Sequence, residues 1–315
     1  MTEIDPTHRA ARWLATFGAA LARGDIAAAV GLFDAECYWR DLLPFTWNIK
    51  TAEGRGAIQA MLEATLGAVR PGAWALEGDA RASDGMTEAW FTFETGVAHC
   101  KGHLRLRGDK CWTLLTTAQG LMGFEERTGR SGTREPGVEH GAFRNRKSWF
   151  ERRQQEAAEL GHARQPYCVI VGGGQGGIAL AARLRRLNVP TIVVEKNARP
   201  GDSWRKRYRS LCLHDPVWYD HMPYLPFPDH WPVFSPKDQI GDWLEMYTRV
   251  MEINYWGGTE CLAARYDDAA AEWEVTLRRA GETIRLRPKQ LVLATGMSGM
   301  PEIPDEQQPA SLAEG

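Results

Sequence analysis

The residues with the clearest chemical use form a glycine-rich stretch in the second half of the chain. Gly172, Gly174 and Gly177 stand in the order GxGxxG, directly after the apolar residues YCVIV and before the helical pattern IALAARLRRL. In such a loop the first glycine permits a tight turn, the second lets the backbone approach a pyrophosphate, and the third lets the helix pack on the strand. The free N–H groups at the start of the helix then face the phosphates. The pattern predicts dinucleotide binding, with Gln175 and Gly176 in the same turn.

An acidic residue closes the strand that follows this helix. Glu195 ends the apolar stretch TIVVE, 23 positions after Gly172, and the helix is expected to end at Asn188 before Pro190. A carboxylate at this place accepts hydrogen bonds from a ribose and repels a 2′-phosphate, so the pattern favours FAD or NAD over NADP. The two strands, the loop, the helix and the acid make one β-α-β unit. The alternative interpretation is a glycine turn with a structural role alone.

Three segments downstream resemble the flavin-containing monooxygenase family, the class B flavoprotein monooxygenases, which include Baeyer-Villiger and plant auxin-pathway enzymes. The segments are RPGDSWRKRYRSLCLHDP, YLPFPDHWPVFSPKD and LVLATGMSGMP, and the resemblance covers about residues 166–305. It implies a protein that binds FAD, takes hydride from NADPH and uses O2 to oxygenate a small organic substrate through a flavin C4a-(hydro)peroxide. The protein would orient the ring and exclude water, because the flavin carries the chemistry.

The same resemblance assigns roles to individual residues. The segment Gly201–Arg205 matches the part of the family that continues from the ribose toward the flavin, and His214-Asp215-Pro216 matches the part beside the flavin ring. Relatives place Asn or Asp where His214 stands, so this histidine is the tentative catalytic residue, with a packed structural histidine as the alternative. Ala294-Thr295-Gly296 resembles the family's strand end near the cofactor, and an ordinary strand-to-loop glycine is the alternative. The candidate cofactor-binding residues are Gly172, Gly174, Gln175, Gly176, Gly177, Glu195, Ser203, Trp204, Arg205, His214, Asp215, Ala294 and Gly296.

The family pattern is incomplete in this sequence. A second GxGxxG for NADPH and an FxGxxxH stretch are expected beyond Gly296, and the residues up to Gly315 contain neither. We therefore expect the chain to be the N-terminal part of a longer enzyme, with the NADPH site absent.

Three other interpretations compete with a monooxygenase. A flavin disulfide reductase needs a CxxC or CxxxxC pair, and the six cysteines are scattered singly. An amine oxidase would show RxGGR where this chain has RPGDSW. A non-catalytic FAD-binding or dimerising fragment stays open.

The first part of the chain has a different pattern. Apolar residues with helical spacing over 13–21 and 58–66 predict two helices, and Asp25 is expected to cap a helix between them that runs to Phe33. Downstream the apolar period changes to two, and a turn at Gly108-Asp109 predicts a strand meander. Helices followed by such a meander indicate an α+β fold.

This order of elements is similar to the cone-shaped superfamily of nuclear transport factor 2 (NTF2-like). That superfamily includes enzymes and dimerisation modules, so the resemblance implies a homodimer through the sheet as one role. Tyr38, Asp41, His99 and His103 are candidates for lining a pocket in the cone, with satisfied structural groups as the alternative. His99 and His103 on a strand would sit too far apart to share a metal, so no metal site is predicted.

We expect three regions along the chain. Residues 1–124 form the NTF2-like domain, and 125–164 form a linker with the charged helix SWFERRQQEAAEL. Residues 165–315 form the N-terminal part of a Rossmann-like α/β FAD-binding domain, with a parallel sheet and a β-hairpin insertion at WEVTLRRAGETIRLR. Within it Ser235 is expected to cap a helix that begins at Pro236. The apolar face of that helix comprises Ile240, Trp243, Leu244, Tyr247, Val250 and Met251.

Composition narrows the partners of this protein. The chain has 315 residues, and 38 Lys and Arg against 40 Asp and Glu are too balanced for a polyelectrolyte that binds nucleic acid. No stretch approaches the roughly 18 apolar residues that span a bilayer, and MTEIDPTHRAAR lacks the features of a signal peptide. We therefore expect a cytoplasmic protein whose partners are a small molecule and O2, with no nucleic acid and no membrane.

Overall fold

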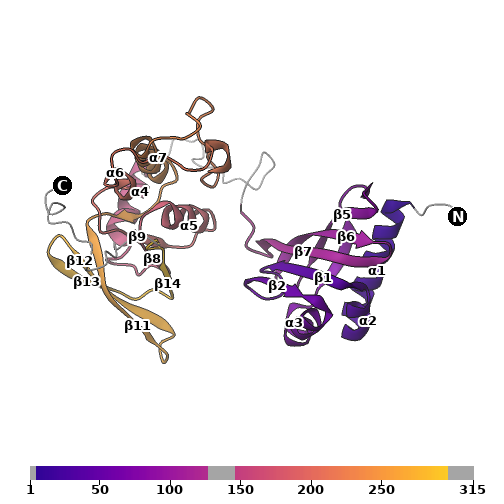
Figure 1. Ribbon diagram of the computed structural model, residues 1–315. Coiled ribbons are helices and arrows are strands. Elements are labelled where there is room, and N and C mark those ends of the chain that lie inside the picture. Colours follow the sequence, from indigo (N-terminus) through magenta and orange to yellow (C-terminus); the bar gives the residue numbers. More distant parts are fainter. Residues whose placement is uncertain (1–4, 127–145, 297–315) are drawn as a thin grey trace, which may run out of the picture. The chain divides into compact units, whose positions relative to one another are not determined.

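The chain divides into two compact units, Met1–Glu125 and Glu126–Gly315. The computed structural model describes residues 5–126 and 146–296 (Figure 1). Much of the expected linker, and the end of the segment LVLATGMSGMP, lie outside the described residues.

The first unit is an α+β domain built on one mixed sheet. Its strands follow the order β2-β1-β7-β6-β5-β3, and β4 pairs with β5. β1 and β7 run parallel, and the other pairs are antiparallel. The helices α1, α2 and α3 pack on this sheet (Figure 1). The elements are α1 (Pro6–Ala22), α2 (Ile26–Gly31), β1 (Phe33–Leu42), β2 (Ile49–Glu53), α3 (Gly54–Val69), β3 (Gly72–Leu76), β4 (Arg81–Ser83), β5 (Met86–Glu94), β6 (Ala98–Arg107) and β7 (Lys110–Leu121).

The three predicted helices and the strand meander after them are confirmed, but two unpredicted strands, β1 and β2, lie between α2 and α3, and one boundary is wrong. The Asp25 side chain caps α2 by accepting a hydrogen bond from the Ala28 N–H (2.9 Å). The helix ends at Gly31 and does not reach Phe33. Phe33 instead begins β1, because it is fully buried and pairs with Cys111 of β7. The NTF2-like assignment and dimerisation through the sheet stay predictions.

Aromatic side chains fill the interior between the sheet and the helices. Trp13 and Phe17 stack with their ring centroids 4.8 Å apart, and Trp74 and Phe93 stack at 4.5 Å. Trp39 is fully buried in the same core. The space in which a cone would hold a ligand is therefore occupied by large side chains of this unit.

The expectation that Tyr38, Asp41, His99 and His103 line one pocket is wrong. Asp41 is fully buried on the core face of β1, and Tyr38 lies three residues earlier, so the two side chains point to opposite faces. His99 is exposed and lies 3.2 Å from Glu94. The His103 ring lies 4.5 Å from the Trp90 ring on the outer face of the sheet.

A buried carboxylate organises the turn between β1 and β2. Asp41 accepts hydrogen bonds from the Thr46 N–H (2.9 Å), the Thr46 hydroxyl (2.8 Å) and the Thr116 hydroxyl (2.7 Å). The turn contains two residues with left-handed backbone, Leu43 (φ 85°) and Trp47 (φ 52°). Side chains with a Cβ seldom adopt this conformation, so the Asp41 hydrogen bonds offset its cost.

We expect Asp41→Ala to lower the stability of the first unit by about 3 kcal/mol, because it leaves buried donors without an acceptor. Differential scanning calorimetry of the full chain should show a transition lowered by roughly 10 °C or more. Asp109→Ala is the control, because Asp109 is exposed and forms surface ion pairs with Arg12 (2.7 Å) and Arg9 (3.8 Å). Equal transitions for the two variants would contradict this role of Asp41.

The second unit combines a parallel sheet with a separate antiparallel one. The parallel sheet has the order β10-β9-β8-β14, which with its helices fits an α/β Rossmann-like fold. The antiparallel sheet has the order β11-β12-β13, so the predicted hairpin is confirmed and a third strand joins it. The elements are α4 (Trp149–Glu159), β8 (Cys168–Val171), α5 (Gln175–Arg186), β9 (Thr191–Val194), α6 (Asp202–Arg205), a 3-10 turn (Val217–Tyr219), α7 (Lys237–Val250), β10 (Tyr255–Trp256), β11 (Thr259–Asp267), β12 (Glu272–Arg279), β13 (Glu282–Leu286) and β14 (Gln290–Leu293).

The start of α7 differs from the prediction. The helix begins at Lys237 with Pro236 as its N-cap, one residue later than expected. Ser235 does not cap it, because its hydroxyl is turned to the Pro232 carbonyl (3.2 Å). The expected apolar face is present, except that Val250 is 57% exposed at the last turn.

The charged helix α4 is attached to the second unit by polar contacts. Glu156 pairs with Arg153 (2.6 Å) and with Arg185 of α5, and it accepts a hydrogen bond from Asn254 Nδ2 (3.1 Å). Among its described residues α4 buries none. Burial acts to raise the pKa of Glu156, but hydrogen bonds from Arg185 and Asn254 and the charges of Arg185 and Arg153 outweigh it, so this pKa lies below its ordinary value.

A carboxylate with a lowered pKa contributes stability above its unfolded-state pKa and loses it as the pH falls through the folded-state pKa. We therefore expect Glu156→Gln to destabilise the protein by about 1 kcal/mol at pH 7. The difference from the parent should shrink as the pH falls below 4.5. Thermal unfolding at several pH values measures it, with Glu159→Gln as the control because, among the described residues, the Glu159 carboxylate accepts from the neutral Gln155 side chain (2.6 Å) and from no cation. A difference that stays constant with pH would count against this assignment.

Candidate functional site

Two glycines of the loop are required by close approaches of the backbone. Gly172 has φ 110°, and a Cβ at this position would lie 2.3 Å from the Ala294 carbonyl oxygen. A Cβ on Gly177 would lie 2.0 Å from the Gly172 carbonyl oxygen. The Ala294 N–H donates to the Val171 carbonyl (2.7 Å), which continues the pairing of β14 with β8. The structure thus places Ala294 against the glycine loop, although Ala294 lies far along the sequence from Gly172 and Gly177.

Gly173 connects the glycine loop to Glu195 and Tyr255, and this position was not predicted from the sequence. Its N–H donates to Glu195 Oε2 (2.7 Å), and its carbonyl accepts a hydrogen bond from the Tyr255 hydroxyl (3.3 Å). A Cβ on Gly173 would lie 2.3 Å from the Tyr255 hydroxyl oxygen. The sequence did carry a signal for Gly173: Gly172–Gly174 are three consecutive glycines, and the GxGxxG pattern accounts only for the first and the third of them.

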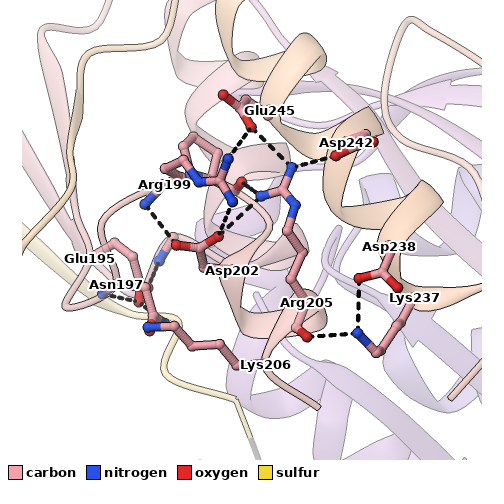
Figure 2. Close-up of polar contacts among 12 residues, drawn as sticks. Glu195, Asn197, Arg199, Asp202, Arg205, Lys206, Lys237, Asp238, Asp242 and Glu245 are labelled. Carbon is pink, nitrogen blue, oxygen red and sulfur yellow. Dashed lines mark hydrogen bonds and ion pairs between the residues drawn. The ribbon is translucent and has the colours of Figure 1, made fainter. Parts of the chain in front are cut away.

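Glu195 is buried at the end of β9, with 8% of its surface exposed. Besides the Gly173 N–H on Oε2, its Oε1 accepts from the Asn197 N–H (2.9 Å) and Asn197 Nδ2 (2.6 Å). Asn197 Oδ1 in turn accepts from Lys206 Nζ (2.7 Å), as Figure 2 shows. Burial first, and then the negative charges of Glu195 and Asp202, raise the pKa of Tyr255. Its hydroxyl therefore stays protonated at neutral pH and can donate to the loop.

Helix α6 places its polar residues beside the N-terminus of α5. Trp204 Nε1 donates to Gln175 Oε1 (3.1 Å). The Ser203 hydroxyl lies 3.9 Å from where a Cβ on Gly174 would stand. Apart from its chain neighbours and the nearby backbone of its own helix, no described atom lies within 4 Å of such a Cβ on Gly176. Gly174, Gln175, Ser203 and Trp204 therefore border the same open side of the glycine loop.

Arg205 points away from the loop and toward α7. Its guanidinium donates to Asp202 Oδ1 (3.1 Å), Asp242 Oδ1 (2.8 Å) and Glu245 Oε2 (3.0 Å), and its side chain is 13% exposed (Figure 2). Burial acts to lower the pKa of Arg205, but the hydrogen bonds that Arg205 donates to Asp242 and Asp202, together with the negative charges of Asp242 and Glu245, raise this pKa above its ordinary value. The described structure thus commits the charge of Arg205 to three acids.

The remaining candidates lie apart from this arrangement. His214 and Asp215 are exposed on the segment between α6 and α7. Within residues 5–126 and 146–296, neither side chain forms a hydrogen bond or ion pair with the glycine loop. Gly296 has φ 77° and is the last residue of the described range.

A hollow of about 260 Å³ opens on the same segment. Trp218, Phe227 and Trp231 form apolar walls, and His221 and Asp229 supply polar groups. Phe227 and Trp231 stack with ring centroids 4.8 Å apart. Such walls suit a planar ring with polar substituents.

Among the described residues, no group of three or more His, Cys, Asp or Glu side chains could hold a metal ion. No helix in the described ranges is long and apolar enough to cross a membrane.

Comparisons with known proteins find similarity in the second unit. Residues 170–228 match the family described as an NAD(P)-binding Rossmann-like domain. The chain is 36% identical over 138 residues to the probable indole-3-pyruvate monooxygenase YUCCA9 of Arabidopsis thaliana, which covers 44% of this chain and 33% of that protein. It is 37% identical over 141 residues to indole-3-pyruvate monooxygenase YUCCA1 of Oryza sativa subsp. japonica. This match covers 44% of this chain and 34% of that protein. The predicted resemblance to flavin monooxygenases is confirmed by these relatives.

The matched part is limited in length. The chain spans about a third of the length of these two relatives. A solved flavin-containing monooxygenase from Stenotrophomonas maltophilia is 21% identical, with a TM-score of 0.40, over 44% of this chain and 41% of its own.

Two adjacent glycines provide a matched test of the loop. We expect Gly177→Ala to lower the stability of the second unit by about 3 kcal/mol, because its Cβ would overlap a backbone carbonyl that cannot give way cheaply. Gly176→Ala should leave stability unchanged or raise it by about 0.5 kcal/mol, because the position is open and helical. Thermal unfolding without ligand measures both. Similar losses in the two variants would show that the approach to Gly172 is not the cause.

Proposed function

We propose that this chain provides the FAD-binding part of a flavin-dependent monooxygenase that oxygenates a small organic substrate. The observation that carries the proposal is the buried Glu195 carboxylate at the end of β9, hydrogen-bonded to the glycine loop at the start of α5. A loop, a helix N-terminus and an acid in this order bind the pyrophosphate and ribose of a dinucleotide. The flavin monooxygenases among the relatives favour FAD over NAD.

The residues present fit a dinucleotide. Gly174 and Gly176 leave their side of the loop open, so a phosphate can approach the backbone. The first N–H groups of an α-helix have no partner within the helix, and α5 directs them to this side. Each carboxylate oxygen can accept two hydrogen bonds, so Glu195 Oε2 keeps capacity for a ribose hydroxyl beside the Gly173 N–H.

The chain's own residues would bind, orient and shield the cofactor. The α5 N-terminus would bind the pyrophosphate, and Glu195 would orient the adenosine ribose. Ser203 and Trp204 would limit water at the open side of the loop, because they border it. When bound, FAD supplies the redox chemistry with NADPH as the hydride donor and O2 as the oxidant. His214 and Asp215 are proposed to lie toward the flavin, on the family resemblance alone.

The first test is the visible spectrum of the full chain with FAD, before and after NADPH under air. We expect bound flavin in the parent protein, with quenched fluorescence. Glu195→Gln should weaken FAD binding about 10- to 100-fold, because a charge-assisted hydrogen bond is worth about 1.5–3 kcal/mol. Glu260→Gln is the control, because Glu260 is an exposed residue of β11 that pairs with Arg278 of β12.

The outcomes separate the parts of the proposal. Free, unquenched FAD with the parent protein would overturn FAD binding. Bound flavin that NADPH does not bleach would favour a FAD-holding role for this chain and overturn turnover with NADPH. Bleaching followed by recovery in oxygen supports the monooxygenase.

A further inference from the structure

Helix α6 must be fixed from outside. It has four residues, Asp202–Arg205, and such a short helix is not stable by its own hydrogen bonds. Its residues Ser203 and Trp204 nevertheless border the open side of the glycine loop, and Trp204 contacts Gln175 there. Any shift of α6 would therefore change the shape of the proposed dinucleotide site.

Two glycines let α6 approach α7 closely. Gly201 precedes α6 with φ 83°, and a Cβ on it would lie 2.2 Å from the Gly241 carbonyl oxygen. A Cβ on Gly241 would lie 2.8 Å from Arg205 Cγ. The Arg205 side chain thus runs across Gly241 to reach Asp242 and Glu245 on the same helix.

A buried lysine on α7 completes the attachment. Lys237 is 7% exposed, and its Nζ donates to the carbonyl oxygen of Arg205 (2.7 Å) and to Asp238 Oδ1 (2.8 Å), as Figure 2 shows. The last carbonyls of a helix have no partner within it, and a positive charge is favourable at this end. The Lys237 ammonium therefore satisfies the C-terminal end of α6. Burying an ammonium group costs free energy unless the group is paired, so the buried Lys237 depends on its contact with the Arg205 carbonyl.

We propose that Lys237 is a positioning residue for the dinucleotide site. It holds α6 against α7, and α6 in turn holds Ser203 and Trp204 beside the glycine loop. Arg205 shares this role, since its charge is directed to α7 and not to the loop. The inference rests on the proposed function for its ligand, but its structural step does not need the ligand.

The test compares Lys237→Met, which keeps the apolar stem, with Lys237→Arg, which keeps a donor. Lys289→Met is the matched control, because Lys289 Nζ also donates to a carbonyl, that of Ala270 (3.2 Å), elsewhere in the second unit. Hydrogen exchange without ligand reports on the α6 amides, where the N–H groups of Trp204 and Arg205 bond to the Gly201 carbonyl. Titration with FAD, well below the unfolding temperature, reports on the site.

We expect Lys237→Met to speed exchange at the α6 amides about tenfold and to weaken FAD binding about tenfold. Lys237→Arg should restore most of both, and Lys289→Met should change neither. Unchanged exchange in Lys237→Met would overturn the inference. Faster exchange with unchanged FAD affinity would also overturn it, because α6 would then not shape the site. If the parent binds no FAD, the proposed function fails, and exchange at the α6 amides alone decides the structural step of the inference.

Discussion

The hydrogen bond from the Gly173 N–H to the buried Glu195 carboxylate joins two turns that the parallel sheet brings side by side. β8 and β9 pair in register up to Val171 and Val194, so the residues that follow each strand meet at the same edge. The turn after β8 leaves the ladder, and its backbone groups need other partners. Glu195 accepts a hydrogen bond from the Gly173 N–H, and the Tyr255 hydroxyl donates one to the Gly173 carbonyl. The loop therefore keeps its shape through side chains from two neighbouring strands.

Much of this arrangement could be predicted because it is local in sequence. The β-α-β unit, the three motif glycines and Glu195 follow from spacing along a single unit. Gly173, Tyr255 and Lys237 could not be found this way, because their partners lie 22 to 82 residues away and depend on tertiary packing. The sequence likewise shows that Arg205 is charged, but only the fold shows that it faces Asp242.

The prediction of a pocket in the first unit failed for a different reason. Tyr38 and Asp41 are both polar residues of one strand, and composition alone groups them together. Their odd spacing puts them on opposite faces, and the aromatic residues of the helices then fill the face that Asp41 shares. Asp41 has a structural role there, because groups of Thr46 and Thr116 beside it donate hydrogen bonds to its carboxylate. Strand parity, applied before chemistry, would have separated the two residues.

The approach of Gly172 to Ala294 ties the loop to the last strand of the described sheet. Ala294 leaves the ribosome 122 residues after Gly172. During synthesis the strand, loop and helix around Gly172 are therefore complete long before β14 can pair beside β8. The loop therefore acquires its final form late in synthesis. Because β11, β12 and β13 precede β14 in the chain, they have already been synthesised when β14 pairs with β8. Nascent chains that stop before β14 would carry the motif without its backbone support.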